Sequence, residues 1–220
     1  MSTSSFTLRY FNAAGIAETT RLLLTAANVE WADEHPEWPA EKSNQPFGRL
    51  PVLIQKSAAN ETDLVISESV TIERYLARTY GFLPADPRKA ALQEQIRDRL
   101  TDISIAFDVQ RLASDDKKEE SVDKFKDLLK RQIEASSKAL RDNGNNGHFF
   151  GSELTYVDIA TYAFFKRMII SVRDAQESIS DLVKASLTPE LHKLIAVVEA
   201  SPRLAAQVDK AEKLVSVLSA

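Results

Sequence analysis

The chain of 220 residues has an apolar share of 44% and a net charge of −4. Its Lys and Arg residues form no basic cluster of the kind that nucleic-acid binding needs, and no apolar run approaches the ~20 residues that span a membrane. Cysteine is absent and the histidines are scattered, so we expect neither disulfides nor a metal site. The N-terminal MSTSSF has no apolar signal-peptide core, so we expect an intracellular, cytoplasmic protein.

Residues 1–83 alternate between strand and helix patterns. Strands are expected from residue 6 to 11 and over 29–34, 52–54 and 64–66. Helices are expected after the turn at Gly15 and over 69–80, where Gly81 is the stop signal. This order predicts a small mixed sheet flanked by helices.

Tyr10 is the first candidate for a functional residue. It lies at the end of the first expected strand, which closes with Tyr10 and Phe11, and Gly15 turns the chain into an amphipathic helix that carries Arg21 and three leucines. A strand that feeds a helix in this way leaves its last residue at the edge of the sheet. Ligands of α/β folds bind at such edges, near the positive end of the helix.

Strand patterns end after residue 83. Residues 84–88 are the best candidate for a linker, because two prolines fall within them. Helices are expected over 88–113 and 122–141, with a charged break at 114–120, and again from Thr155 to about residue 172 and over 178–219. Thr155 and Asp158 have the spacing of a capping box. The prediction is an α/β domain of residues 1–83, the linker, and an all-α domain of residues 89–220.

Segments 10–18, 47–53, 67–76 and 151–160 occur together in one order and spacing. In that combination the chain resembles the cytosolic glutathione transferases of the tyrosine type, with the alpha, sigma and mu classes nearest. The resemblance implies a thioredoxin-like N-terminal domain that binds glutathione. It also implies an all-α domain that forms the hydrophobic substrate pocket, a homodimer, and conjugation of glutathione to hydrophobic electrophiles in detoxification. Glutathione would be a substrate, with no metal involved.

The resemblance also implies roles for single residues. Tyr10 would be the catalytic residue, whose hydroxyl stabilises the glutathione thiolate. The other residues that would bind glutathione are Trp38, Lys42, Arg49, Leu50, Pro51, Glu68, Ser69 and Asp102. The hydrophobic pocket would be lined by Phe11, Ile16, Phe107, Arg111 and Leu218, with the C-terminal helix around Leu218 as a lid.

Several of these assignments have alternatives. Lys42 and Arg49 could equally well be solvated surface charges. Asp98 is the alternative to Asp102 as the residue that reaches the partner subunit. Phe47 resembles the aromatic residue that some classes insert into the partner, and Arg74 resembles a residue on the dimer axis, although both residues can also pack within their own subunit.

The turn after Tyr10 departs from the alpha-class pattern. Those proteins carry Arg before or after the glycine, whereas this chain has Ala14 and Ile16, and Ile16 cannot supply the positive field that an Arg after the glycine would add near the sulfur. An alternative is therefore a non-catalytic protein of the same fold that binds glutathione or a hydrophobic ligand. Another alternative keeps the thiolate but uses it for isomerisation or peroxide reduction.

Overall fold

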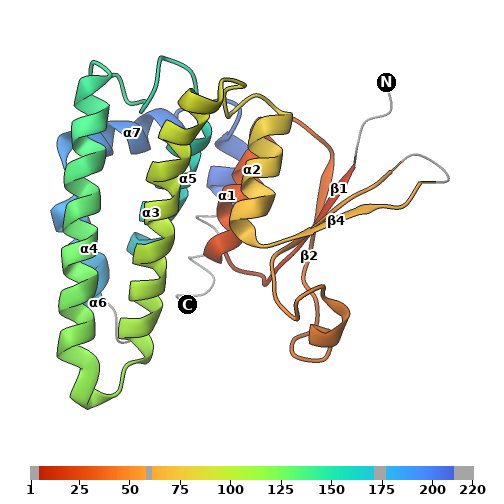
Figure 1. Cartoon of the computed structure of the whole chain (residues 1–220), viewed down its shortest axis with the longest axis horizontal. Coiled ribbons are helices and arrows are strands. Elements are labelled where there is room, and N and C mark those ends of the chain that lie inside the picture. Colours follow the sequence, from red (N-terminus) through yellow and green to blue (C-terminus); the bar gives the residue numbers. More distant parts are fainter. Residues whose placement is uncertain (1–4, 58–60, 171–176, 211–220) are drawn as a thin grey trace. The chain divides into compact units, whose positions relative to one another are not determined.

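The computed structural model describes residues 5–57, 61–170 and 177–210. The chain divides into two compact units, Met1–Leu83 with Glu199–Ala220, and Pro84–Val198 (Figure 1). Residues 199–210 were expected in the helical domain, but they belong to the first unit. The reason is that Arg203, Gln207 and Lys210 all make polar contacts with residues of the first unit.

The first unit contains a four-stranded sheet in the order β2-β1-β3-β4. The strands are β1 (Phe6–Arg9), β2 (Trp31–Glu34), β3 (Val52–Gln55) and β4 (Leu64–Ser67). β1 runs parallel to β2 and antiparallel to β3, and β3 runs antiparallel to β4. The sheet is therefore mixed, as the sequence predicts.

The helices of the first unit are α1 (Glu18–Ala26) and α2 (Ser69–Thr79), with short 3-10 turns η1 (Gly15–Ala17) and η2 (Lys42–Asn44). α1 and α2 pack against each other, and both lie beside the sheet in Figure 1. Phe6 and Leu8 alternate with half-buried residues along β1 and are fully buried. The Phe6 ring meets that of Tyr80, just after α2, edge to face at 6.3 Å. The core of this unit thus lies between β1 and the helices.

The second unit is helical where it is described. It contains α3 (Pro87–Leu112), α4 (Asp115–Asp142), α5 (Tyr156–Ile170), α6 (Glu177–Ser186) and α7 (Pro189–Glu199). The long helices α3 and α4 pack side by side, and α5 packs against both α3 and α6 (Figure 1). Among the described residues, no helix is both long and apolar enough to cross a membrane.

The start of α4 corrects one expectation. Residues 114–120 were expected to break the helix, but α4 already begins at Asp115, with Ser114 as its N-cap. Asp115 and Asp116 lie in the first turn, where negative charge interacts favourably with the helix dipole. A charged stretch at this position therefore starts the helix and does not interrupt it.

The expected capping box at the start of α5 is confirmed. Asp158 Oδ2 accepts hydrogen bonds from the Thr155 backbone N–H at 2.9 Å and from the Thr155 hydroxyl at 2.7 Å. Its other oxygen accepts from the Phe149 N–H at 2.9 Å. Asp158 is fully buried, so these bonds join the preceding loop to the helix in a dry environment.

Candidate functional site

Tyr10 lies immediately after β1, at the end of the sheet. Its backbone N–H donates to the Glu34 carbonyl at 3.0 Å, which continues the pairing of β1 with β2 by one residue. The side chain is 8% exposed, and its hydroxyl oxygen accepts a hydrogen bond from the Ile16 backbone N–H at 3.3 Å. The turn after β1 therefore folds back onto the Tyr10 hydroxyl.

Gly15 makes this close return possible. Its φ is +50°, a backbone conformation that is costly for other residues. A Cβ at this position would lie 2.5 Å from the Tyr10 hydroxyl oxygen. The turn needs glycine both for its backbone conformation and for the space that the phenol occupies.

Two apolar side chains near Tyr10 are exposed on the surface of the first unit. Phe11 is 40% exposed and Ile16 is 39% exposed. The Phe11 ring meets the Tyr10 ring at 5.2 Å and the Trp38 ring at 5.6 Å, both edge to face. The first unit thus presents exposed apolar groups next to a phenol hydroxyl.

The register of the sheet brings the other predicted residues of this unit to the same edge. Arg9 pairs with Val52, and Val52 pairs with Ser67. One step further along each strand are Tyr10, Pro51 and Glu68, which therefore form a row across the end of the sheet. The Leu50–Pro51 peptide bond is cis, and Leu50 is half-buried beside it.

Glu68 and Ser69 form the junction between β4 and α2. Glu68 is the N-cap of α2 with φ 71°, a strained conformation for a residue with a side chain. Ser69 is the first residue of the helix, whose N-terminal N–H groups attract negative charge. Ser67 has a buried hydroxyl without a hydrogen-bond partner among the described residues. The junction therefore combines strain, polar groups and a positive helix end.

The segment that carries Trp38 and Lys42 is attached to β1 through Arg9. The Arg9 guanidinium donates to Glu41 at 2.6 Å, and the other Glu41 oxygen accepts from the Glu37 N–H at 2.9 Å. The Glu37 N–H, helped by Arg9, lowers the pKa of Glu41. Lys42 is exposed next to Gly48. Arg49 is also exposed, so both cations face solvent.

The remaining predicted residues lie in the second unit or outside the described chain. Asp102 and its rival Asp98 are both exposed on α3. Asp102 also borders a groove of about 480 Å³ between α3 and α4. Phe107 is buried on α3 against Phe125, at 5.8 Å between ring centroids, so its ring belongs to the helical core.

Arg111 is half exposed and pairs with Asp108 at 3.7 Å. Leu218 lies outside the described residues.

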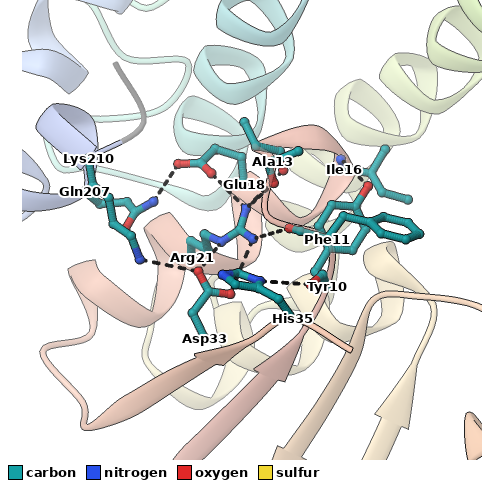
Figure 2. Close-up of polar contacts among 11 residues, drawn as sticks. Tyr10, Phe11, Ala13, Ile16, Glu18, Arg21, Asp33, His35, Gln207 and Lys210 are labelled. Carbon is teal, nitrogen blue, oxygen red and sulfur yellow. Dashed lines mark hydrogen bonds and ion pairs between the residues drawn. The ribbon is translucent and has the colours of Figure 1, made fainter. Parts of the chain in front are cut away.

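The structure reveals a functional candidate that the sequence patterns missed. Arg21 on α1 is only 1% exposed, and its guanidinium is enclosed by oxygen atoms (Figure 2). It binds Asp33 through Nε at 2.9 Å and Glu18 through Nη1 at 3.2 Å. The available signal was the spacing of Glu18 and Arg21, which puts opposite charges on one face of a helix with few other charges.

Arg21 also holds the loop between Tyr10 and Gly15. Its Nη1 donates to the carbonyl oxygens of Ala13 at 2.9 Å and Ala14 at 3.1 Å, and its Nη2 donates to that of Phe11 at 3.3 Å. The guanidinium carbon is 5.7 Å from the centre of the Tyr10 ring. This buried cation therefore determines the path of the loop that carries the predicted catalytic residue.

Comparison with known proteins agrees with this geometry. Residues 6–78 match the model for "Glutathione S-transferase, N-terminal domain", and residues 102–210 match that for "Glutathione S-transferase, C-terminal domain". The chain belongs to the glutathione S-transferase family. The family and fold predicted from the sequence are thus confirmed, and with them the class of enzyme at the level of the family.

Three relatives indicate the range of this family. S-crystallin SL11 of Nototodarus sloanii is 30% identical, over 94% of this chain and 96% of its own. Probable glutathione S-transferase 6 of Caenorhabditis elegans is 32% identical, over 70% and 75%. Hematopoietic prostaglandin D synthase of Gallus gallus is 30% identical, over 95% and 98%. Among solved structures, the sigma class GST of Fasciola hepatica has a TM-score of 0.76 at 25% identity, over 96% of this chain and 98% of that one.

Proposed function

We propose that this protein is a homodimeric, cytoplasmic glutathione transferase that conjugates glutathione to hydrophobic electrophiles. The observation that carries the proposal is the Tyr10 hydroxyl at the end of the sheet, oriented by the Ile16 N–H at 3.3 Å. A hydroxyl oxygen that accepts from a backbone N–H can use its own proton to donate to a sulfur. Tyr10 would in this way stabilise the glutathione thiolate.

The energy required is within reach of one such hydrogen bond. A free thiol has a pKa of about 8.5, so only a few per cent is thiolate at neutral pH. Lowering this pKa by about two units needs about 2.7 kcal/mol of preference for the thiolate. A hydrogen bond to a charged group contributes about 1.5–3 kcal/mol. One well-oriented hydroxyl is therefore sufficient to activate the thiol.

The rest of glutathione would lie along the row that Tyr10 begins. Leu50, before the cis bond to Pro51, would pair its backbone with the cysteinyl part, as an added strand does. Glu68 suits the γ-glutamyl ammonium, and the N-terminus of α2 at Ser69 suits its carboxylate. The strained φ of Glu68 supports a functional role for this junction.

The family resemblance is the basis for proposing further polar contacts to glutathione. Trp38, Lys42 and Arg49 would bind the glycyl carboxylate, and Lys42 and Arg49 are exposed cations suited to this role. Asp102 would reach the γ-glutamyl group bound by the partner subunit of a homodimer. Phe47, 70% exposed, is the candidate anchor for that dimer.

The hydrophobic electrophile would first meet Phe11 and Ile16. Both side chains are exposed; the Phe11 ring contacts the Tyr10 ring, and the Ile16 backbone N–H binds the Tyr10 hydroxyl, where the thiolate would form. Apolar groups at this place would desolvate an electrophile next to the sulfur. Ile16 supplies no charge, so activation here would depend on Tyr10 and not on an Arg at position 16.

Two further functions are favoured by particular observations. A non-catalytic ligand-binding protein is favoured by Ala14 and Ile16 in the turn and by the S-crystallin relative. A glutathione-dependent isomerase is favoured by the prostaglandin D synthase relative, since isomerisation would use the same thiolate without conjugation. Peroxide reduction would also use this thiolate.

The experiment that separates activation from mere binding is a titration of the glutathione complex, followed by thiolate absorbance in the ultraviolet. We expect an apparent thiol pKa well below the free value of about 8.5. Binding with an unchanged thiol pKa would reject the transferase mechanism in favour of a binding protein. Conjugation, isomerisation and peroxide-reduction assays on the same preparation then distinguish the uses of the thiolate.

A further inference from the structure

Two residues of the C-terminal segment 199–210 contact Glu18 and Asp33, the two carboxylates that bind Arg21 (Figure 2). The Gln207 side-chain amide donates to Glu18 Oε1 at 2.8 Å, and Lys210 Nζ lies 3.4 Å from Asp33 Oδ2. Gln207 is 3% exposed, and it lies 189 residues after Glu18 in the chain. A buried amide that reaches a buried carboxylate over such a separation belongs to the folded core of this unit.

A continuous series of contacts leads from Gln207 to the turn at Tyr10. Glu18 accepts from Gln207 with one oxygen and from Arg21 with the other. Arg21 donates to the loop carbonyls described above, and that loop continues through Gly15 to Ile16. The Ile16 N–H then donates to the Tyr10 hydroxyl. Each link is a hydrogen bond or the covalent chain.

Burial makes these links interdependent. Glu18 and Arg21 are both almost inaccessible to water, so a lost partner is not replaced by solvent. Without the Gln207 amide, Glu18 Oε1 loses its hydrogen-bond donor. The Glu18 carboxylate would then rotate and change its hydrogen bonds with Arg21. Arg21 makes many bonds with one rigid guanidinium, so a rotation toward Glu18 would weaken those to the loop.

We propose that the segment 199–210 positions the Tyr10 hydroxyl through Gln207, Glu18 and Arg21. Gln207 is a positioning residue, because it acts on the hydroxyl through the loop. Lys210 supports the same network from the Asp33 side, where its side chain is half exposed. The effect of this positioning on thiol activation rests on the proposed function of Tyr10, whereas its effect on the loop does not.

The test compares Gln207→Met with Gln132→Met. Both replacements remove a buried side-chain amide and keep an unbranched side chain of similar length. Gln132 is 2% exposed on α4 and donates to Ser136 at 3.1 Å, outside this network. The first readout is hydrogen exchange of the Ile16 amide in the free protein, measured by NMR. We expect the Ile16 amide to exchange several-fold faster in Gln207→Met than in the wild type. In Gln132→Met its exchange rate should not change, with the two variants compared under conditions in which they are equally stable.

The second readout is the thiol pKa of bound glutathione in the same variants. We expect Gln207→Met to raise it by about half to one unit, which from an activated pKa of about 6.5 leaves about 1.5- to 3-fold less thiolate at neutral pH. Activity should recover at alkaline pH, where glutathione ionises without help. A purely structural role would lower activity by the same factor at every pH.

The outcomes distinguish this inference from the proposed function. Unchanged Ile16 exchange in Gln207→Met overturns the inference, whatever the thiol does. Faster exchange with an unchanged thiol pKa keeps the positioning of the loop and overturns its role in activation. A wild-type thiol pKa equal to that of free glutathione rejects the proposed function, while the exchange rates still decide the positioning. If Gln207→Met does not fold, Lys210→Met must speed Ile16 exchange, and an unchanged rate there overturns the inference.

Discussion

The Tyr10 hydroxyl occupies the space that a side chain on Gly15 would need, because a Cβ there would lie 2.5 Å from the hydroxyl oxygen. Gly15→Ala should therefore displace the hydroxyl and raise the thiol pKa of bound glutathione. The positive φ of +50° should also cost about 1–2 kcal/mol of stability. Titration of the complex and denaturant unfolding measure the two effects.

Gly81→Ala is the matched control for this change. Gly81 also has a positive φ, of +77°, but a Cβ there would meet no atom within 4 Å. We expect a similar loss of stability and an unchanged thiol pKa. An equal rise of the thiol pKa in both variants would show that general destabilisation, and not the displaced hydroxyl, is responsible.

Tyr10→Phe should remove thiol activation while leaving glutathione binding largely intact. One hydrogen bond to a charged group is lost, so the conjugation rate at neutral pH should fall about 10- to 100-fold. Tyr80→Phe removes a hydroxyl elsewhere in the same unit and should have little effect. Steady-state kinetics with a hydrophobic electrophile measure both, and an unchanged rate in Tyr10→Phe would reject the mechanism but not the fold.

Arg21→Met should be strongly destabilising. It leaves the buried Glu18 and the half-buried Asp33 carboxylates without their main partner, and breaking a buried pair in this way typically costs about 3–5 kcal/mol. Arg131→Met on α4 removes an exposed pair with Asp127, so a change of at most about 0.5 kcal/mol is expected there. Equal free energies of unfolding for the two variants would contradict the buried role of Arg21.

The pair of His148 and Asp158 should make stability depend on pH. Asp158 Oδ2 lies 3.3 Å from His148 Nδ1 and raises the pKa of His148. A raised pKa in the folded state favours the protonated form. The stabilisation is therefore fully present below the unfolded pKa of about 6.5 and is lost as the pH rises through the folded value.

Denaturant unfolding across this pH range measures that effect. The stability difference between the wild type and His148→Gln should shrink as the pH rises above about 6.5. His192→Gln, at an exposed position on α7, is the control and should show no such trend. A constant difference for His148→Gln would mean that the protonation of His148 is not linked to folding.

Phe47 should contribute to dimer stability if the proposed homodimer forms. A large aromatic side chain that is 70% exposed on one chain is a candidate anchor for a partner surface. Phe47→Ser should shift the equilibrium toward monomer in sedimentation experiments at micromolar concentration. Phe47→Leu keeps an apolar anchor and should retain more dimer, and a wild type that is monomeric at every concentration would reject the dimer.

Local patterns predicted much of the fold. The long helix expected over 88–113 is α3 (Pro87–Leu112), although Pro87, which was expected in the linker, already belongs to the helix, with Asp86 as its N-cap. The Thr155–Asp158 box was readable because its partners are three residues apart. The position of Tyr10 at the end of a strand was also predicted, from the change from strand to helix pattern around Gly15.

Contacts between distant segments were not readable in this way. The row of Tyr10, Pro51 and Glu68 depends on the register of three strands, which packing of the whole sheet determines. Arg21 read as one polar residue of an amphipathic helix, although it is buried among oxygen atoms from several segments. Gln207 carried no signal, since its partner Glu18 lies 189 residues away. Local sequence rules act over a few residues, whereas the surroundings of the Tyr10 loop arise only when remote segments pack together and exclude water.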